Sequence, residues 1–173
     1  ARPSGVVVER MINPDGTVAF ETVAGRTTEY HYDDPLGRVT HTQPPGATNA
    51  IAVAYDDANR TVTTERGGST LTTTTDGFGR PIETVNGAGV KTRTRYDAEG
   101  RKQYQSHPFV SSEIGTEFVY DSLGRLTEEI NADGTRRTRA YDDTTNAVPV
   151  RAAENRALVL SYRGFGHPSP PRL

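Results

Sequence analysis

One short pattern, Tyr-Asp and then Gly-Arg with two residues between the pairs, recurs through most of this chain. Its clearest copy runs from Tyr120 to Thr127, and successive Tyr positions are spaced 20 to 24 residues apart. A fixed period of this length predicts a repeat architecture, in which one small structural unit is stacked many times. The pattern occupies Tyr32, Asp33, Gly37, Arg38, Tyr55, Asp56, Asn59, Arg60, Asp76, Gly79, Arg80, Tyr96, Asp97, Gly100, Arg101, Tyr120, Asp121, Gly124, Arg125, Tyr141 and Asp142.

The spacing inside the pattern is typical of a hairpin turn. A type I turn favours Asp at its first position and Gly at its fourth. The Asp side chain accepts a hydrogen bond from the backbone two residues on, and Gly supplies the left-handed residue that closes a bulged hairpin. Asn59 stands where the other copies have Gly, and we expect it to be left-handed. Pro35 adds a fixed φ after Asp34.

A second set of turns is expected between the Tyr-Asp turns. Segments 13–17 and 131–135 are near copies, Asn-Pro-Asp-Gly-Thr and Asn-Ala-Asp-Gly-Thr, and we assign both to this second set. Two turns per repeat predict two short strands per repeat. The expected strands are 6–12, 17–23, 26–32, 38–42, 50–55, 61–65, 70–75, 80–85, 90–96, 101–105, 116–120, 125–130, 135–141, 147–151 and 157–162.

Composition supports an ordered all-β protein with a thin core. Leu, Ile, Val and Phe total 32 of 173 residues, while 24 Thr, 15 Val and 8 Tyr favour strands. The predicted fold is an antiparallel β-hairpin repeat array that forms a curved, open sheet. About seven units of roughly 21 residues cover 1–166, and the Pro-rich segment 167–173 is predicted to be a tail or linker.

The sequence nominates no catalytic residue, cofactor or metal site, so we do not expect an enzyme. Paired carboxylates such as Asp56-Asp57 are explained by turn chemistry, since adjacent strand residues point to opposite faces. The Asn-x-Asp-Gly segments lack the Glu that a calcium loop needs at position twelve. His31 and Asp33 are too few ligands for zinc. Without cysteine, there is neither a disulfide framework nor a thiolate site.

Charge and hydropathy exclude two classes of partner. The net charge is −2, with 18 Arg and 2 Lys interspersed among acids, which gives no electrostatic case for nucleic acid. No apolar run approaches the 18 residues of a membrane span. The chain begins with Ala1 rather than Met, which favours a piece of something longer.

The Tyr rows allow two interpretations. Exposed rings at repeat spacing could stack on sugars, as in a glycan-binding or adhesion module. Alternatively, each Tyr half-buries its ring beside the turn and packs on a neighbouring Arg. The two ends of the sheet would be bare edges, available to neighbouring repeats of a longer parent chain, to self-association or to another partner.

The segments Tyr120–Thr127 and Tyr96–Arg101 resemble the signature of the YD-repeat family, also called Rhs repeats. The resemblance runs from about residue 11 to residue 166. It implies a β-sheet that spirals into a hollow shell, as in bacterial Rhs polymorphic toxins and Tc-type insecticidal complexes, where the shell can enclose a toxic domain. Related animal surface proteins use the shell in adhesion.

The resemblance therefore implies a secreted or cell-surface, non-enzymatic wall segment involved in toxin encapsulation and delivery, with a toxin domain or surface glycans as further partners. One departure limits this expectation. The Asp-Pro-x-Gly-rich core segment with aspartyl autoprotease residues, which toxin-releasing members of the family carry, is not found after the repeats. The resemblance therefore assigns neither self-cleavage nor a toxic domain to this chain.

Overall fold

The computed structural model describes residues 5–46, 49–142, 147–151 and 157–161. These residues form fifteen β-strands and no helix, which confirms the predicted all-β class. The strands are β1 (Val8–Ile12), β2 (Val18–Val23), β3 (Arg26–His31), β4 (His41–Gln43), β5 (Ile51–Asp56), β6 (Thr61–Arg66), β7 (Ser69–Thr75), β8 (Pro81–Asn86), β9 (Lys91–Tyr96), β10 (Lys102–Ser106), β11 (Gly115–Tyr120), β12 (Leu126–Ile130), β13 (Arg136–Arg139), β14 (Ala147–Arg151) and β15 (Ala157–Ser161).

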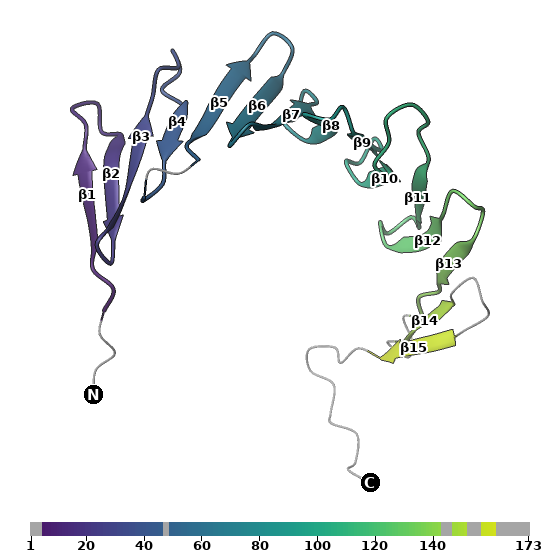
Figure 1. The fold of residues 1–173 in the computed structure, drawn as a ribbon. Coiled ribbons are helices and arrows are strands. Elements are labelled where there is room, and N and C mark those ends of the chain that lie inside the picture. Colours follow the sequence, from purple (N-terminus) through teal and green to yellow (C-terminus); the bar gives the residue numbers. More distant parts are fainter. Residues whose placement is uncertain (1–4, 47–48, 143–146, 152–156, 162–173) are drawn as a thin grey trace. The chain divides into compact units, whose positions relative to one another are not determined.

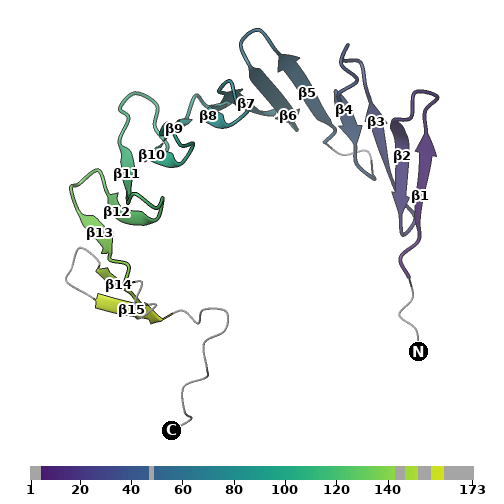
Figure 2. The same ribbon diagram turned by 180° about the vertical axis from the view of Figure 1, so that it is seen from behind.

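The chain divides into two compact units, residues 1–91 and 92–173. In the first unit, each strand from β1 to β7 pairs antiparallel with the next strand in sequence, as far as β8. In the second unit, each strand from β9 to β14 does the same, as far as β15. Figures 1 and 2 show this sequential order within each unit. The connections are hairpins, so most hydrogen bonds join segments that are close in sequence. The tail 167–173 lies outside the described residues.

The sheet buries little apolar surface. Within the described ranges, Ala19 is the one buried apolar residue, Ser106 the one buried polar residue, and no large side chain is fully buried. This confirms the thin core expected from composition. A single layer of strands has no second layer to pack against, so cross-strand side-chain pairs and hydrogen bonds must supply much of its stability.

Register shifts fall beside the predicted turns. The ladder is irregular between Thr74 and Thr75 in the β7–β8 pair, and between Val119 and Tyr120 in the β11–β12 pair. The Gly of these turns is left-handed, with φ of +79° at Gly79 and +78° at Gly124. The bulged hairpin predicted from the Asp and Gly spacing is therefore present in both copies.

The expectation for Asn59 is wrong. The left-handed residue of this turn is Arg60, with φ of +53°. The β5–β6 ladder runs without a bulge from Ile51 to the pair Asp56–Thr61. The loop between these strands therefore has four residues, and its last residue, Arg60, takes the left-handed conformation. Asn59 instead bonds the Asp56 carboxylate through its backbone N–H (3.0 Å) and its Nδ2 (2.6 Å).

One further turn is confirmed and one assignment changes. In the first full copy, the turn begins at Asp34, before Pro35, as expected, since the Gly37 N–H donates to the Asp34 carbonyl at 2.9 Å. Segment 13–17 joins β1 to β2, as 76–80 joins β7 to β8, whereas 131–135 joins β12 to β13. Segment 13–17 therefore belongs with the Tyr-Asp turns, and Ile12 occupies the Tyr position.

Candidate functional site

Each complete turn is closed by an Asp–Arg pair four residues apart. In the clearest case, Arg101 donates to Asp97 from its backbone N–H (2.8 Å to Oδ1) and from Nε (2.6 Å to Oδ2). Arg125 makes the same two bonds to Asp121, at 2.9 and 2.8 Å. Because one carboxylate holds both the backbone and the guanidinium, the Arg side chain leaves the turn in a fixed direction.

These contacts lower the pKa of the turn carboxyls. The Arg38 guanidinium, and to a lesser extent backbone N–H groups, lower the pKa of Asp34 to about 2 against an opposing effect of burial. For Asp97, burial is the largest single effect and raises the pKa, but hydrogen bonds from Arg101 outweigh it and the net pKa is lowered. The turn aspartates are thus held ionised as structural acceptors, which is opposite to what a general acid needs.

The Arg of one repeat lies over the Tyr ring of the next. The guanidinium carbon is 4.0 Å from the ring centre for Arg38 and Tyr55, and 4.7 Å for Arg101 and Tyr120. For Arg125 and Tyr141 the distance is 4.4 Å. These are cation–π distances. The expected packing of Tyr on a neighbouring Arg is confirmed, and the Arg belongs to the preceding repeat.

The Tyr hydroxyl makes a second contact with the preceding repeat. Tyr120 Oη donates to the carbonyl of Lys102 at 2.7 Å, and Tyr141 Oη donates to that of Leu126 at 2.8 Å. Each acceptor directly follows the stacking Arg. The same bond joins Tyr55 to the Val39 carbonyl at 3.0 Å. We call this combination the repeat clamp: Asp holds Arg, Arg stacks on the Tyr of the next repeat, and the Tyr hydroxyl bonds the carbonyl that follows the Arg.

The incomplete copies show which parts of the clamp are separable. Tyr32 donates to the Val18 carbonyl at 3.0 Å although Thr17 stands in the Arg position, so the hydroxyl bond forms without the stack. Thr75, which replaces Tyr, donates from its backbone to the Arg60 carbonyl at 2.9 Å. Of the remaining pattern residues, Tyr96 ends β9 and Asp142 follows β13.

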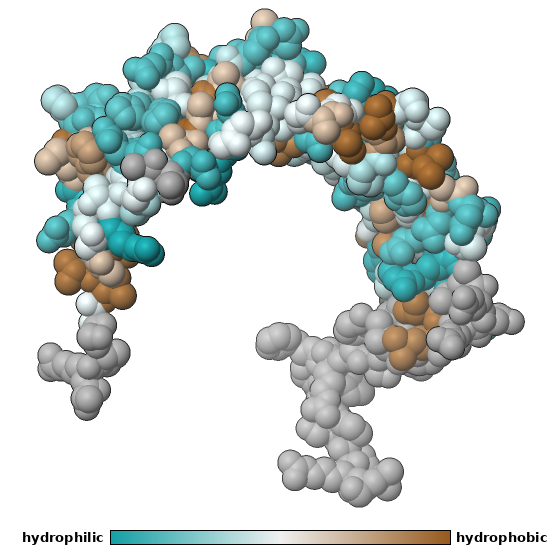
Figure 3. Space-filling model, viewed as in Figure 1, coloured by the Kyte–Doolittle hydropathy of each residue, from teal (hydrophilic) through white to brown (hydrophobic). Residues whose placement is uncertain are grey.

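Strand β1 and the two residues before it expose a run of apolar side chains at one end of the first unit's sheet. Five apolar side chains within seven residues are 47% to 66% exposed: Val6, Val7, Val8, Met11 and Ile12. Figure 3 shows brown, hydrophobic atoms gathered near the start of this strand. No described strand pairs with this edge, so its backbone groups and apolar side chains are open to another strand.

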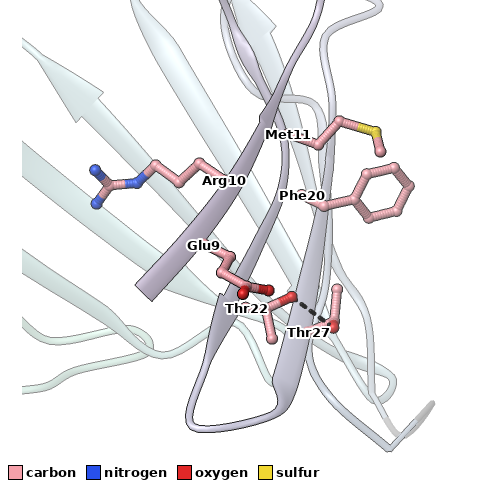
Figure 4. Close-up of a pocket in the computed structure, with 6 residues that line it drawn as sticks. All are labelled: Glu9, Arg10, Met11, Phe20, Thr22 and Thr27. Carbon is pink, nitrogen blue, oxygen red and sulfur yellow. Dashed lines mark hydrogen bonds between the residues drawn. The ribbon is translucent and has the colours of Figure 1, made fainter. Parts of the chain in front are cut away.

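A recess of about 430 Å³ opens beside this edge. Met11 and Phe20, which are cross-strand partners, project to the same side in Figure 4, and Arg10 projects to the other side, where it pairs with Glu21. A hydrogen bond of 2.8 Å between the hydroxyls of Thr22 and Thr27 bounds the lower part of the recess. The recess suits an apolar side chain more than a polar small molecule.

The connection 107–114, between β10 and β11, is held by an ion-pair cluster. Glu113 accepts from Arg93 (2.8 Å) and from Arg95 (2.8 Å), and its side chain is 17% exposed. Sequence reasoning missed this cluster because Glu113 is 18 to 20 residues from the two arginines and the three follow no repeat.

The connection ends at Gly115, where a Cβ would lie 2.2 Å from the Gln105 carbonyl oxygen, so only Gly fits there.

Neither a metal centre nor a membrane helix is found in the described part of the chain. No three His, Asp or Glu side chains are gathered there as a cation site. No helix with the length and hydropathy of a membrane span occurs among the same residues.

Comparison with known proteins gives distant structural matches only. No family profile and no curated protein sequence matches the chain. Among solved structures, the TcdB2–TccC3 complex with Cdc42 matches 90% of this chain at 13% identity and a TM-score of 0.49. A mutant Tc holotoxin pore from Photorhabdus luminescens matches 90% at 13% identity and a TM-score of 0.46. This chain spans 11% and 10% of the length of those chains. These matches do not place it in a family.

Proposed function

We propose that this chain is a non-enzymatic structural segment of a β-repeat wall, and that the wall serves toxin encapsulation and delivery outside the producing cell. The repeat clamp carries the proposal. The residues that recur most regularly are those that join one repeat to the next: the Asp carboxylate holds the Arg guanidinium, and the Tyr hydroxyl donates to a backbone carbonyl of the preceding repeat. A pattern used in this way maintains the spacing of the strands. Its recurring side chains serve as structural bonding partners and not as catalytic groups.

The toxin role rests on the Tyr-Asp-x-x-Gly-Arg signature and its family resemblance, together with a sheet that fits a wall. A single layer with almost no buried side chain has two faces open to water, which suits a partition between bulk solvent and a wet interior. The apolar edge of β1 offers a place where another repeat, of the parent chain or of a partner, adds to the sheet.

The test uses the gene product as the cell makes it, with the turn 97–101 or 121–125 deleted. We expect limited proteolysis to spare an enclosed domain in the wild type and to degrade it in either deletion. Replacement of the exposed, unpaired Arg26 by Lys serves as the control and leaves protection intact. A hydrolase or transferase activity of the purified chain that one point mutation abolishes would contradict the structural role.

A second candidate function is an adhesion or glycan-binding module. The described Tyr rings are poorly placed for it, because Tyr55, Tyr120 and Tyr141 each have an Arg over the ring and a hydroxyl bonded to backbone. The observation that favours it is the exposed edge of β1 with its recess. A glycan array distinguishes the candidates: binding that is lost in Met11→Asp and kept in Tyr120→Ala assigns recognition to the edge.

A further inference from the structure

Two histidines face each other across β3 and β4 of the first unit. His31 ends β3, His41 begins β4, and the register makes them direct cross-strand partners. Their ring centres are 5.4 Å apart, with the ring planes at 74°. Glu29, two residues before His31 and therefore on the same face of the sheet, places Oε1 3.2 Å from His31 Nε2. The wall function uses none of these three side chains.

We propose that His31 and His41 bind a divalent transition-metal ion of the class that prefers imidazole, such as Zn²⁺, Ni²⁺ or Cu²⁺. The two imidazole nitrogens are the primary ligands. The described residues gather no third ligating side chain with them, so water fills the remaining positions.

The spacing of the pair fits this chemistry. With a zinc–nitrogen bond of about 2.0 Å in the ring plane and a tetrahedral angle, two imidazole centres lie roughly 5.2 Å apart. The observed separation is 5.4 Å, so the two rings are close enough for one ion to reach both.

The surroundings favour a cation and allow it to enter. The side chains of His31 and Glu29 are 47% and 39% exposed, so an ion reaches them from solvent. The cross-strand neighbours of Glu29 are Phe20 and Gln43, and that of His41 is Ala52. None of these is basic, so no positive side chain directly opposite repels an ion, and Ala52 is small enough to leave space beside the His41 ring.

Metal binding would have a structural consequence in this part of the sheet. Strand β4 has three residues, the fewest of any described strand, and the His pair lies at its first residue. An ion held by both imidazoles adds a link between β3 and β4, which three residue pairs join. Because the ion binds the folded pair and not the separated strands, it raises the stability of the first unit.

The test is a calorimetric titration of the purified, chelator-treated chain with ZnCl₂, and separately with NiCl₂, in a non-coordinating buffer. We expect one ion per chain, and at least tenfold weaker binding in His31→Gln and in His41→Gln. His107→Gln is the matched control, because His107 is an exposed histidine without a His partner, and it leaves binding unchanged. Circular dichroism verifies that each variant keeps its β-structure.

A measurement on the wild type keeps the proposal testable if the variants misfold. Paramagnetic Cu²⁺ at a low ratio to protein should broaden the imidazole NMR signals of His31 and His41 before those of the other two histidines. Equal broadening of all four histidines or absence of zinc binding would overturn the proposed site. So would zinc binding in both single variants that is weakened by less than tenfold. None of these outcomes bears on the wall function, which rests on other residues.

Discussion

The guanidinium of Arg101 lies over the ring of Tyr120, 4.7 Å from its centre, and joins two successive repeats. The Tyr120 hydroxyl donates to the carbonyl of Lys102, the residue next to that Arg. The Asp97 carboxylate accepts a hydrogen bond from Arg101 Nε at 2.6 Å. Three side chains from two repeats thus form one connected unit. In a sheet with almost no buried core, such units are where a small chemical change should have a measurable effect.

Removing the Tyr120 hydroxyl should weaken the fold without removing the stack. Tyr120→Phe keeps the ring under Arg101 and loses the bond to the Lys102 carbonyl, so we expect a loss of about 1 kcal/mol in the free energy of unfolding. Urea denaturation measures it. Tyr30→Phe is the control, since the described structure gives the Tyr30 hydroxyl no hydrogen bond. Equal effects of the two substitutions would contradict the assigned bond.

Replacing Arg101 by Lys should destabilise the chain although the charge is kept. A lysine has no planar group to cover the Tyr120 ring and cannot reproduce the Nε bond to Asp97. We expect a lower urea midpoint for Arg101→Lys. The same exchange at Arg26, an exposed position, should leave the midpoint unchanged. If both exchanges were neutral, Arg101 would act only as a positive charge.

The turn that contains Gly77 and Gly79 offers a matched pair of glycines. Gly79 has φ of +79°, whereas Gly77 is not left-handed, and a Cβ on either would meet no atom within 4 Å. Gly79→Ala should therefore cost about 1 kcal/mol in the free energy of unfolding through backbone strain alone. Gly77→Ala should be neutral or slightly stabilising. A similar loss from both would mean that space rather than φ selects Gly in this turn.

Acid should loosen the clamps over a defined range of pH. The pKa of Asp34 is lowered to about 2 from an ordinary value of 3.8, so its pairing with Arg38 is complete above the ordinary value. Its contribution to stability is then lost as the pH falls from about 4 to about 2. NMR titration of the Asp34 carboxyl carbon checks the premise directly. A midpoint near 3.8 would show that the pair does not hold in solution.

Sequence alone predicted the strands and most turns because each turn is local. Asp97 and Gly100, the first and fourth residues of the turn, determine its conformation without help from the rest of the chain. The prediction failed where two local solutions compete. Asn59 tolerates the left-handed conformation, but with the regular β5–β6 register the left-handed residue is Arg60.

The contacts between repeats were harder to predict. Recurrence of Arg and Tyr suggested that they pack together, but only the register shows that Arg125 meets Tyr141 of the following repeat. The pairing of His31 with His41 had no sequence signal, because it depends on a nine-residue connection whose length the repeat does not determine. Chemistry within one turn is predictable here, and chemistry across the ladder depends on register.

A double-mutant cycle between Arg101 and Tyr120 tests the central claim most directly. Urea midpoints are measured for the wild type, Arg101→Met, Tyr120→Leu and the double variant, with Arg101→Met plus Tyr30→Leu as a distant control pair. The repeat clamp predicts that the combined loss at Arg101 and Tyr120 is clearly smaller than the sum of the single losses, while the control pair is additive. Additive losses at Arg101 and Tyr120 would show that the two repeats are not coupled through these side chains.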